Sequence, residues 1–230
     1  MAARGGICLG LHYSCRIRRP ASADFSMSRQ PILLDTADHD RNSAGMRYVY
    51  PVLSRRAGGI SVGINLNPNN ACNWRCIYCQ VPNLTRGGPP PIDLGLLEDE
   101  LITLLDQIQA GCFLGQAADG VKPSRQLVDI AFSGNGEPTS AEEFPAAVAI
   151  AYRVLAARGL TDRLKLRLIT NGSFLDRPAV QTGIAQLGQA GGEVWFKLDA
   201  ATPAGLAKIN GTRANPQAIA RRLAHCATLA

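Results

Sequence analysis

Short apolar segments with the composition of β-strands alternate along this chain with segments of helical periodicity, and this alternation restricts the folds open to it. The strand-like segments lie at residues 59–66, 127–132, 164–169 and 193–198. A repeated strand-then-helix order favours a parallel sheet whose strands are joined by crossover helices. The sequence therefore predicts an α/β fold built from about four βα units.

The predicted helices carry recognisable start and stop signals. They are expected at residues 94–108, at 146–158, from about residue 176, at 203–209 and from residue 215. Pro145 stands near the start of the second helix and Gly159 just past its end, which is the favoured placement of these residues. Asn215 is the expected N-cap of the last helix, with Pro216 in its first position. Residues 48–53 also have β-strand composition.

The length and composition are those of one globular domain. The 230 residues are 46% apolar and 18% charged, which is ordinary for a packed protein. Residues 1–46 are predicted to be an N-terminal extension that is at least partly disordered, and residues 47–230 to be the core domain. The first 25 residues are rich in arginine and poor in acids, so a transit peptide and an unstructured extension are both open.

The net charge and the hydropathy narrow the possible partners. About half of the +6 formal charge comes from the first 25 residues, so the rest of the chain is only mildly basic. This is weak support for nucleic-acid binding. No apolar run approaches the length of a membrane span, and no membrane partner is expected.

Seven cysteines in a chain without a good secretion signal do not indicate a disulfide framework. Cys72, Cys76 and Cys79 form a C-x3-C-x2-C run, and clustered thiols must stay reduced to bind a metal. A reducing, cytoplasmic location is expected. Zinc is one candidate ligand, but it prefers four closed ligands and no second cysteine or histidine pair follows. An iron–sulfur cluster is the better match, and a cluster held by three cysteines has one open coordination position.

Polar clusters follow each predicted strand. They lie at residues 72–79, 135–137, 170–171 and 197–199. Because the carboxyl ends of parallel strands meet at one edge of a sheet, these clusters are expected to face a common cavity.

These clusters resemble the motifs of the radical S-adenosylmethionine (SAM) superfamily. The cysteine run with Tyr78 before its last cysteine resembles the first motif of that superfamily, and Gly136-Glu137-Pro138, Thr170-Asn171-Gly172 and Leu198-Asp199-Ala200 resemble the next three. Residues 64–68 and 80–83 resemble the subgroup of iron–sulfur oxidoreductases related to wyosine-tRNA synthases. The resemblance covers about residues 59–200.

The resemblance implies a fold, an activity and two cofactors. The fold would be a partial (β/α) barrel, with a [4Fe-4S] cluster on the three cysteines and SAM on the open iron. The activity would be reductive cleavage of SAM to a 5′-deoxyadenosyl radical, with flavodoxin or ferredoxin as electron donor and an unknown substrate. An RNA-modifying enzyme, with tRNA as substrate, and a non-catalytic iron–sulfur protein or truncated remnant are the alternatives.

Glu137, Gly136 and Asn171 are the ligand residues that the resemblance implies first. Glu137 would accept a hydrogen bond from the SAM ammonium group, Gly136 would let the backbone approach the ligand, and Asn171 would contact the ribose or carboxylate. The alternative is that these residues simply form turns after their strands.

Asp199, Lys197 and Tyr78 complete the expected site. Asp199 would accept from a ribose hydroxyl or, alternatively, cap the next helix. Lys197 would lie near the SAM carboxylate or else on the surface. Tyr78, together with Trp74, would lie beside the adenine or cover the cluster, with ordinary packing as the alternative.

The number of βα units departs from the pattern of the superfamily, whose usual core has six. After the fourth unit an exposed strand edge is expected, which is a liability for aggregation. The chain is then either truncated, or a partner or residues 48–53 cover that edge.

Overall fold

A five-stranded mixed sheet forms the centre of the protein. The computed structural model describes residues 31–35, 41, 43–54, 58–115 and 125–229. The order of strands is β2-β3-β7-β8-β9, where the strands are β2 (Val49–Ser54), β3 (Gly59–Ile64), β7 (Leu127–Phe132), β8 (Lys165–Thr170) and β9 (Glu193–Phe196). β2 runs antiparallel to β3, and the other neighbours are parallel. The predicted α/β fold is therefore confirmed, with one antiparallel strand added.

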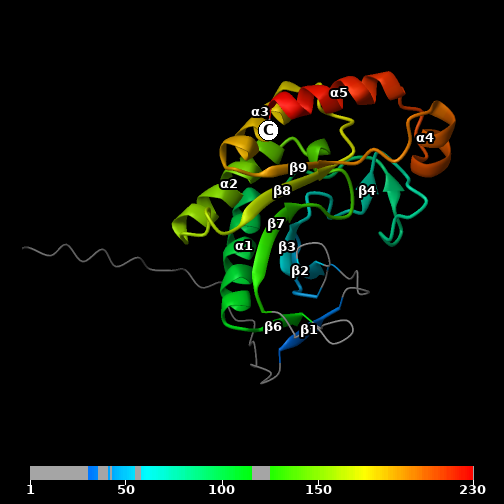
Figure 1. Cartoon of the computed structure of the whole chain (residues 1–230). Helices are drawn as coiled ribbons and strands as arrows, with labels where there is room; N and C mark the ends of the chain where they lie inside the picture. The colour runs from blue at the N-terminus through cyan, green and yellow to red at the C-terminus, as the bar shows by residue number, and fades with distance from the viewer. Residues whose placement is uncertain (1–30, 36–40, 42, 55–57, 116–124, 230) are drawn as a thin grey trace, which may run out of the picture.

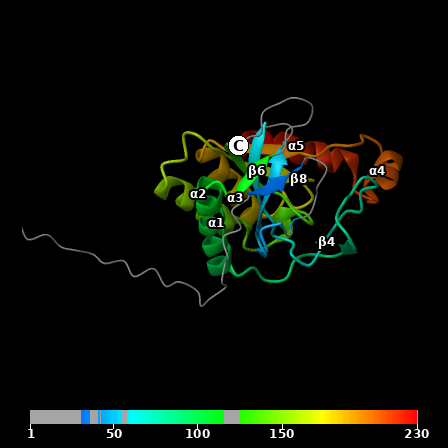
Figure 2. The ribbon, with the colours of Figure 1, turned by 90° about the horizontal axis from the view of Figure 1, so that it is seen from below.

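The described part of the chain contains five α-helices. They are α1 (Leu94–Gln109), α2 (Phe144–Ala157), α3 (Pro178–Gln189), α4 (Pro203–Asn210) and α5 (Pro216–Leu229). Figures 1 and 2 show α1, α2 and α3 on one side of the sheet, while α4 lies at the far end near β4. Asn215 Oδ1 accepts from the Gln217 amide, as expected of an N-cap. None of these helices combines the length and the apolar character needed to cross a lipid bilayer.

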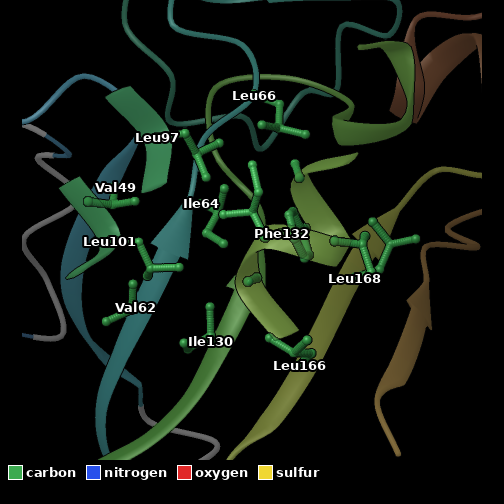
Figure 3. Packing of buried hydrophobic residues seen from close by; sticks show 14 of the residues in the cluster. Val49, Val62, Ile64, Leu66, Leu97, Leu101, Ile130, Phe132, Leu166 and Leu168 are labelled. Atoms are coloured by element: carbon green, nitrogen blue, oxygen red, sulfur yellow. The ribbon is translucent and has the colours of Figure 1, made fainter. Parts of the chain in front are cut away.

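The apolar core lies between the sheet and the helices α1, α2 and α3. Alternate residues of each strand point into it, which is the period-two pattern of a strand covered on that face. Figure 3 shows Ile64 beside Leu97 and Leu101 of α1, with Ile130 and Leu168 on the next two strands, and all five belong to one buried cluster. Each of these side chains is at most 1% exposed. The helical spacing of apolar residues in the sequence therefore identified the buried face of α1 correctly.

The other face of the sheet carries a polar ladder that crosses four strands. Ser61 Oγ donates to Asp129, the Arg167 guanidinium donates to the other oxygen of Asp129, and Arg167 Nε donates to Glu193 Oε2 at 3.0 Å. The Arg167 guanidinium also lies 4.9 Å from the centre of the Trp195 ring. Asp129 is only 3% exposed, so its charge depends on Arg167 for compensation.

Because of Glu193, the free energy of unfolding of the protein should depend on pH in the acid range. The hydrogen bond and charge of Arg167 lower the pKa of Glu193 below its ordinary value of 4.5. A carboxylate with a lowered pKa in the folded state stabilises the protein above its unfolded pKa, and this contribution is lost as the pH falls through the folded pKa. The free energy of unfolding of Glu193→Gln, measured in urea, should therefore be lower than that of the wild type at pH 6. The difference should shrink as the pH falls below about 4.5, and a constant difference would contradict this assignment.

The edges of the sheet differ from the sequence-based expectation. Residues 48–53 were a candidate to cover the edge after the fourth unit, but β2 pairs with β3 at the opposite edge of the sheet. Within the described chain β9 pairs with β8 alone. β2 reaches β3 because only a short connection separates them, whereas reaching β9 would need a crossing of the whole sheet.

Two small sheets were not anticipated. β1 (Ile32–Leu34) pairs in parallel with β6 (Phe113–Gly115), and β4 (Ala71–Cys72) pairs in parallel with β5 (Thr85–Arg86). β1 lies inside the predicted N-terminal extension, whose first 30 residues fall outside the described ones. Strands of two or three residues carry no periodic pattern, so only the long-range pairing defines them.

Candidate functional site

The loops at the carboxyl edge of the sheet enclose a cavity of about 450 Å³. Of the nine expected site residues, eight line this cavity: Cys72, Cys76, Tyr78, Cys79, Gly136, Glu137, Asn171 and Lys197. Tyr50, Val52 and Ile169 of the sheet form part of its wall. Each of the four predicted polar clusters therefore contributes residues to this one cavity, whereas Thr170 and Asp199 do not line it.

The three cysteines lie on one loop that begins at β4. Cys72 and Cys76 are half-buried and Cys79 is exposed, and all three are free thiols. Among the described residues, no group of three or more histidine, cysteine, aspartate or glutamate side chains is arranged to hold a metal ion. The loop thus places three thiols at one cavity without presenting a preformed metal site.

Cys72 is the thiol most affected by its surroundings. Burial raises its pKa above the ordinary value, and electrostatic interaction with Glu137, Cys76 and Cys79 acts in the same direction. This interaction arises because the four groups share the cavity. The neutral thiol of Cys72 is therefore favoured until a cation enters and displaces its proton.

Glu137 lies at the floor of the cavity and connects two strand ends. Its Oε1 accepts from Thr139 N at 3.2 Å and from the hydroxyls of Thr139 and Thr170 at 2.6 Å. Its Oε2 accepts from Asn171 N at 2.7 Å. Burial raises the pKa of this carboxyl, against the lowering effect of these hydrogen bonds. Oε2 accepts a single bond among the described residues and so retains capacity for a ligand donor.

Asparagine side chains join the strand-end loops to the cysteine loop. Asn171 Nδ2 donates to Asn73 Oδ1 at 3.0 Å, and Asn135 Nδ2 donates to Asn70 Oδ1 at 2.6 Å. Gly136 packs so closely against Ala71 and Asn67 that a Cβ atom at this position would overlap both. The role expected for Gly136 was close approach to a ligand, and the structure shows close approach to the cysteine loop.

Tyr78, Lys197 and Asp199 form a second group at the rim. The Tyr78 hydroxyl donates to Asp199, and Lys197 Nζ lies 4.6 Å from the centre of the Tyr78 ring. Asp199 also accepts from Asn210 Nδ2 at 2.6 Å and does not line the cavity. Asp199 therefore holds protein groups in place, whereas contact with a ligand ribose was expected.

The last turn of α4 holds the cysteine loop in place, and the sequence analysis did not identify this contact. Asn210 is fully buried, its Nδ2 lies 3.3 Å from Cys76 Sγ, and its carbonyl accepts from Arg75 N at 2.9 Å. Trp74 packs against Leu206 and Ile219 and is 4% exposed. Trp74 thus anchors the cysteine loop on α4 and α5, which supports the packing interpretation. No local pattern marks Asn210, because its contacts span 134 residues of sequence.

Comparison with known proteins finds a similarity over part of the chain. No family model matches the chain. A stretch of 157 residues, 68% of the chain, is 25% identical to a protein of Brachyspira hyodysenteriae named GTPase Obg. The match spans 20% of that protein. The chain therefore corresponds to about a fifth of the length of this relative.

These findings correct the assignment to the radical SAM superfamily. The relative is named as a GTPase, and no family model supports a radical SAM enzyme. The predicted SAM-cleaving iron–sulfur oxidoreductase is therefore wrong on this comparison. Among the described side chains, no metal-binding group supports the iron–sulfur part of that prediction. The C-x3-C-x2-C spacing misled because three thiols on a loop are a local feature that does not by itself define a family.

The sequence lacks the usual phosphate-binding element of GTPases. A P-loop requires a lysine directly after a glycine in the pattern G-x-x-x-x-G-K-[ST]. None of the lysines in the sequence follows a glycine: Lys122, Lys165, Lys197 and Lys208. The segment shared with the relative therefore does not include a P-loop.

Proposed function

We propose that the cavity at the carboxyl edge of the sheet binds a nucleoside-containing small molecule beside a metal centre held by cysteines. The observation that carries this proposal is that Cys72, Cys76 and Cys79 line the same cavity as Glu137 and Asn171. Its volume of about 450 Å³ lies within the range of small-ligand sites. The wall formed by Tyr50, Val52 and Ile169 supports a partial (β/α) barrel whose inner face holds the ligand.

A [4Fe-4S] cluster is the metal cofactor that the donor set fits best. Cysteine thiolates are the ligands that such clusters use. The loop is fastened at its start by pairing with β5 and in its middle by hydrogen bonds to the last residues of α4. Because the thiols are not already arranged around a metal, binding would draw the exposed Cys79 toward Cys72 and Cys76. Metal binding and ordering of this loop are therefore expected to be coupled.

SAM is the nucleoside ligand that the charges of the cavity favour. Its ammonium group matches Glu137, a buried carboxylate with capacity left at Oε2, and its carboxylate matches Lys197 at the rim. The exposed ring of Tyr78 offers a flat surface for a base. These groups would bind and orient the ligand.

A guanine nucleotide is the second candidate ligand. The observation that favours it is the 157-residue match to GTPase Obg. Without a P-loop its phosphates would have to be bound by other cations, of which Lys197 and Arg41 line the cavity. The Glu137 carboxylate would repel those phosphates, so the charge of the cavity favours SAM over GTP.

Replacing Cys76 tests the metal centre. Anaerobic reconstitution with iron and sulfide should load the wild-type protein and produce visible absorbance, and Cys76→Ala should lose both the iron and the colour. Cys112→Ala is the matched control, because Cys112 is a half-buried cysteine that does not line the cavity. Equal iron content in the wild type and in Cys76→Ala would contradict the proposed centre.

Calorimetric titration of the same preparations with SAM and with GTP distinguishes the two ligands. Saturable binding of SAM, lost or weakened at least about tenfold in Glu137→Gln, supports the first ligand. Saturable binding of GTP without binding of SAM would contradict SAM as the ligand and support a guanine nucleotide.

A further inference from the structure

A second pocket lies next to the main cavity and has a different chemical character. Its volume is about 230 Å³. Its lining includes Arg41, Arg47, Asn65, Asn69 and Asn135, and none of its lining residues among the described ones is acidic. The two pockets share Arg41, Tyr50 and Asn135 in their walls. The second pocket is therefore a cationic and amide-rich extension of the first.

Aromatic and amide contacts hold the two arginines at this pocket. Arg41 Nη1 donates to Asn135 Oδ1 at 2.7 Å, and its guanidinium lies 5.6 Å from the centre of the Tyr50 ring. The Arg47 guanidinium lies 5.3 Å from the centre of the Tyr48 ring. Both rings are buried, so they provide fixed surfaces on which a guanidinium can rest.

The charges of these arginines are available for a ligand. Arg47 is exposed, and the ion pairs found among the described residues involve neither Arg41 nor Arg47. Glu100 lies nearby, but it accepts from the backbone amides of Arg47 and Tyr48 rather than from a guanidinium. Two guanidinium groups around a small pocket whose described lining holds no carboxylate favour an anion with several oxygen acceptors.

We propose that this second pocket binds the phosphate group of a nucleotide, with Arg41 and Arg47 as its cationic ligands. The shared wall allows one molecule to place its phosphate in the second pocket and the rest of its structure toward the main cavity. The same chemistry would suit a mononucleotide or a nucleotide at the end of an RNA strand. This site requires neither a metal at the cysteines nor SAM at Glu137.

Arg47→Gln is the decisive variant, because Arg47 lines the second pocket and not the main cavity. Titration with adenosine 5′-monophosphate should show saturable binding to the wild type that inorganic phosphate competes away. Arg47→Gln should weaken this binding at least about tenfold, as expected for the loss of charged hydrogen bonds. Titration with adenosine should give the same weak or absent binding in both proteins.

Arg153→Gln is the matched control for net charge. Arg153 is an exposed arginine that pairs with Glu98 on the helical side of the molecule, so its removal should change the affinity for the mononucleotide less than about twofold. A six-nucleotide RNA, titrated in parallel, distinguishes a free nucleotide from the end of an RNA strand as the ligand. If the RNA binds more tightly than the mononucleotide and its binding also depends on Arg47, the ligand is RNA.

Two outcomes would overturn the proposal. One is the absence of saturable binding of the mononucleotide to the wild type. The other is an equal loss of affinity in Arg47→Gln and Arg153→Gln, which would show a general charge effect. Binding of SAM should be unchanged in Arg47→Gln. If the main cavity fails to bind SAM, the proposal for the second pocket is not affected, because it is tested with a different ligand.

Discussion

Arg167→Ala is expected to lower the free energy of unfolding by about 3–5 kcal/mol. The substitution leaves Asp129, which is 3% exposed, with Ser61 as its remaining hydrogen-bond donor among the contacts of the polar ladder. An uncompensated buried carboxylate is strongly destabilising because it has lost both water and its counter-ion. Urea denaturation followed by circular dichroism measures the change.

Two further variants show whether charge causes this effect. Arg153→Ala removes an exposed ion pair with Glu98 and should cost less than about 1 kcal/mol. The double variant Arg167→Ala with Asp129→Asn should be more stable than Arg167→Ala alone, because it also removes the unpaired charge. If Arg167→Ala costs no more than Arg153→Ala, the ladder does not stabilise the sheet as argued.

Glu137→Ala should destabilise the protein by about 2–6 kcal/mol, which is about 1–3 kcal/mol for each buried backbone donor left without a partner. Those donors are the amides of Thr139 and Asn171. Glu137→Gln keeps an acceptor for one of them and should cost about half as much. Thermal and urea denaturation of both variants measures the difference.

Glu142→Ala is the control for the loss of a nearby carboxylate. Glu142 is exposed, so its removal should change the free energy of unfolding by no more than about 0.5 kcal/mol. A cost for Glu137→Ala within that same range would show that Glu137 does not hold the two strand ends together. In that case its four hydrogen bonds would be incidental to the fold.

The main elements of the fold could be predicted from local patterns. Apolar residues at helical spacing marked α1 from Leu94, and the apolar run of β7 was placed at its observed residues, Leu127–Phe132. Glu137 and the cysteine loop were also placed at the correct edge of the sheet. These features depend on residues close together in the sequence, whose side-chain period and turn chemistry are visible without the fold.

The contacts that hold the cysteine loop in place could not be predicted in the same way. Asn210 lies next to Cys76, and Asp199 accepts from Tyr78, across more than 100 residues of sequence. Polar side chains such as these are compatible with many surroundings, so their composition does not reveal their partners. The assignment to a family was also wrong on the comparison, because the quoted motifs are short and each is also an ordinary turn after a strand.

The sequence alone determined the alternation of strands and helices and the gathering of Cys72, Cys76, Cys79, Glu137 and Asn171 at one edge of the sheet. The tertiary structure decided that β2 pairs with β3 and that Glu137 is fastened to Thr139, Thr170 and Asn171. It also decided that Arg41 and Arg47 meet at a second pocket. The physical reason is that periodicity and turn preference act over a few neighbouring residues. Strand edges, buried hydrogen bonds and pockets are made by residues that only the folded chain brings together.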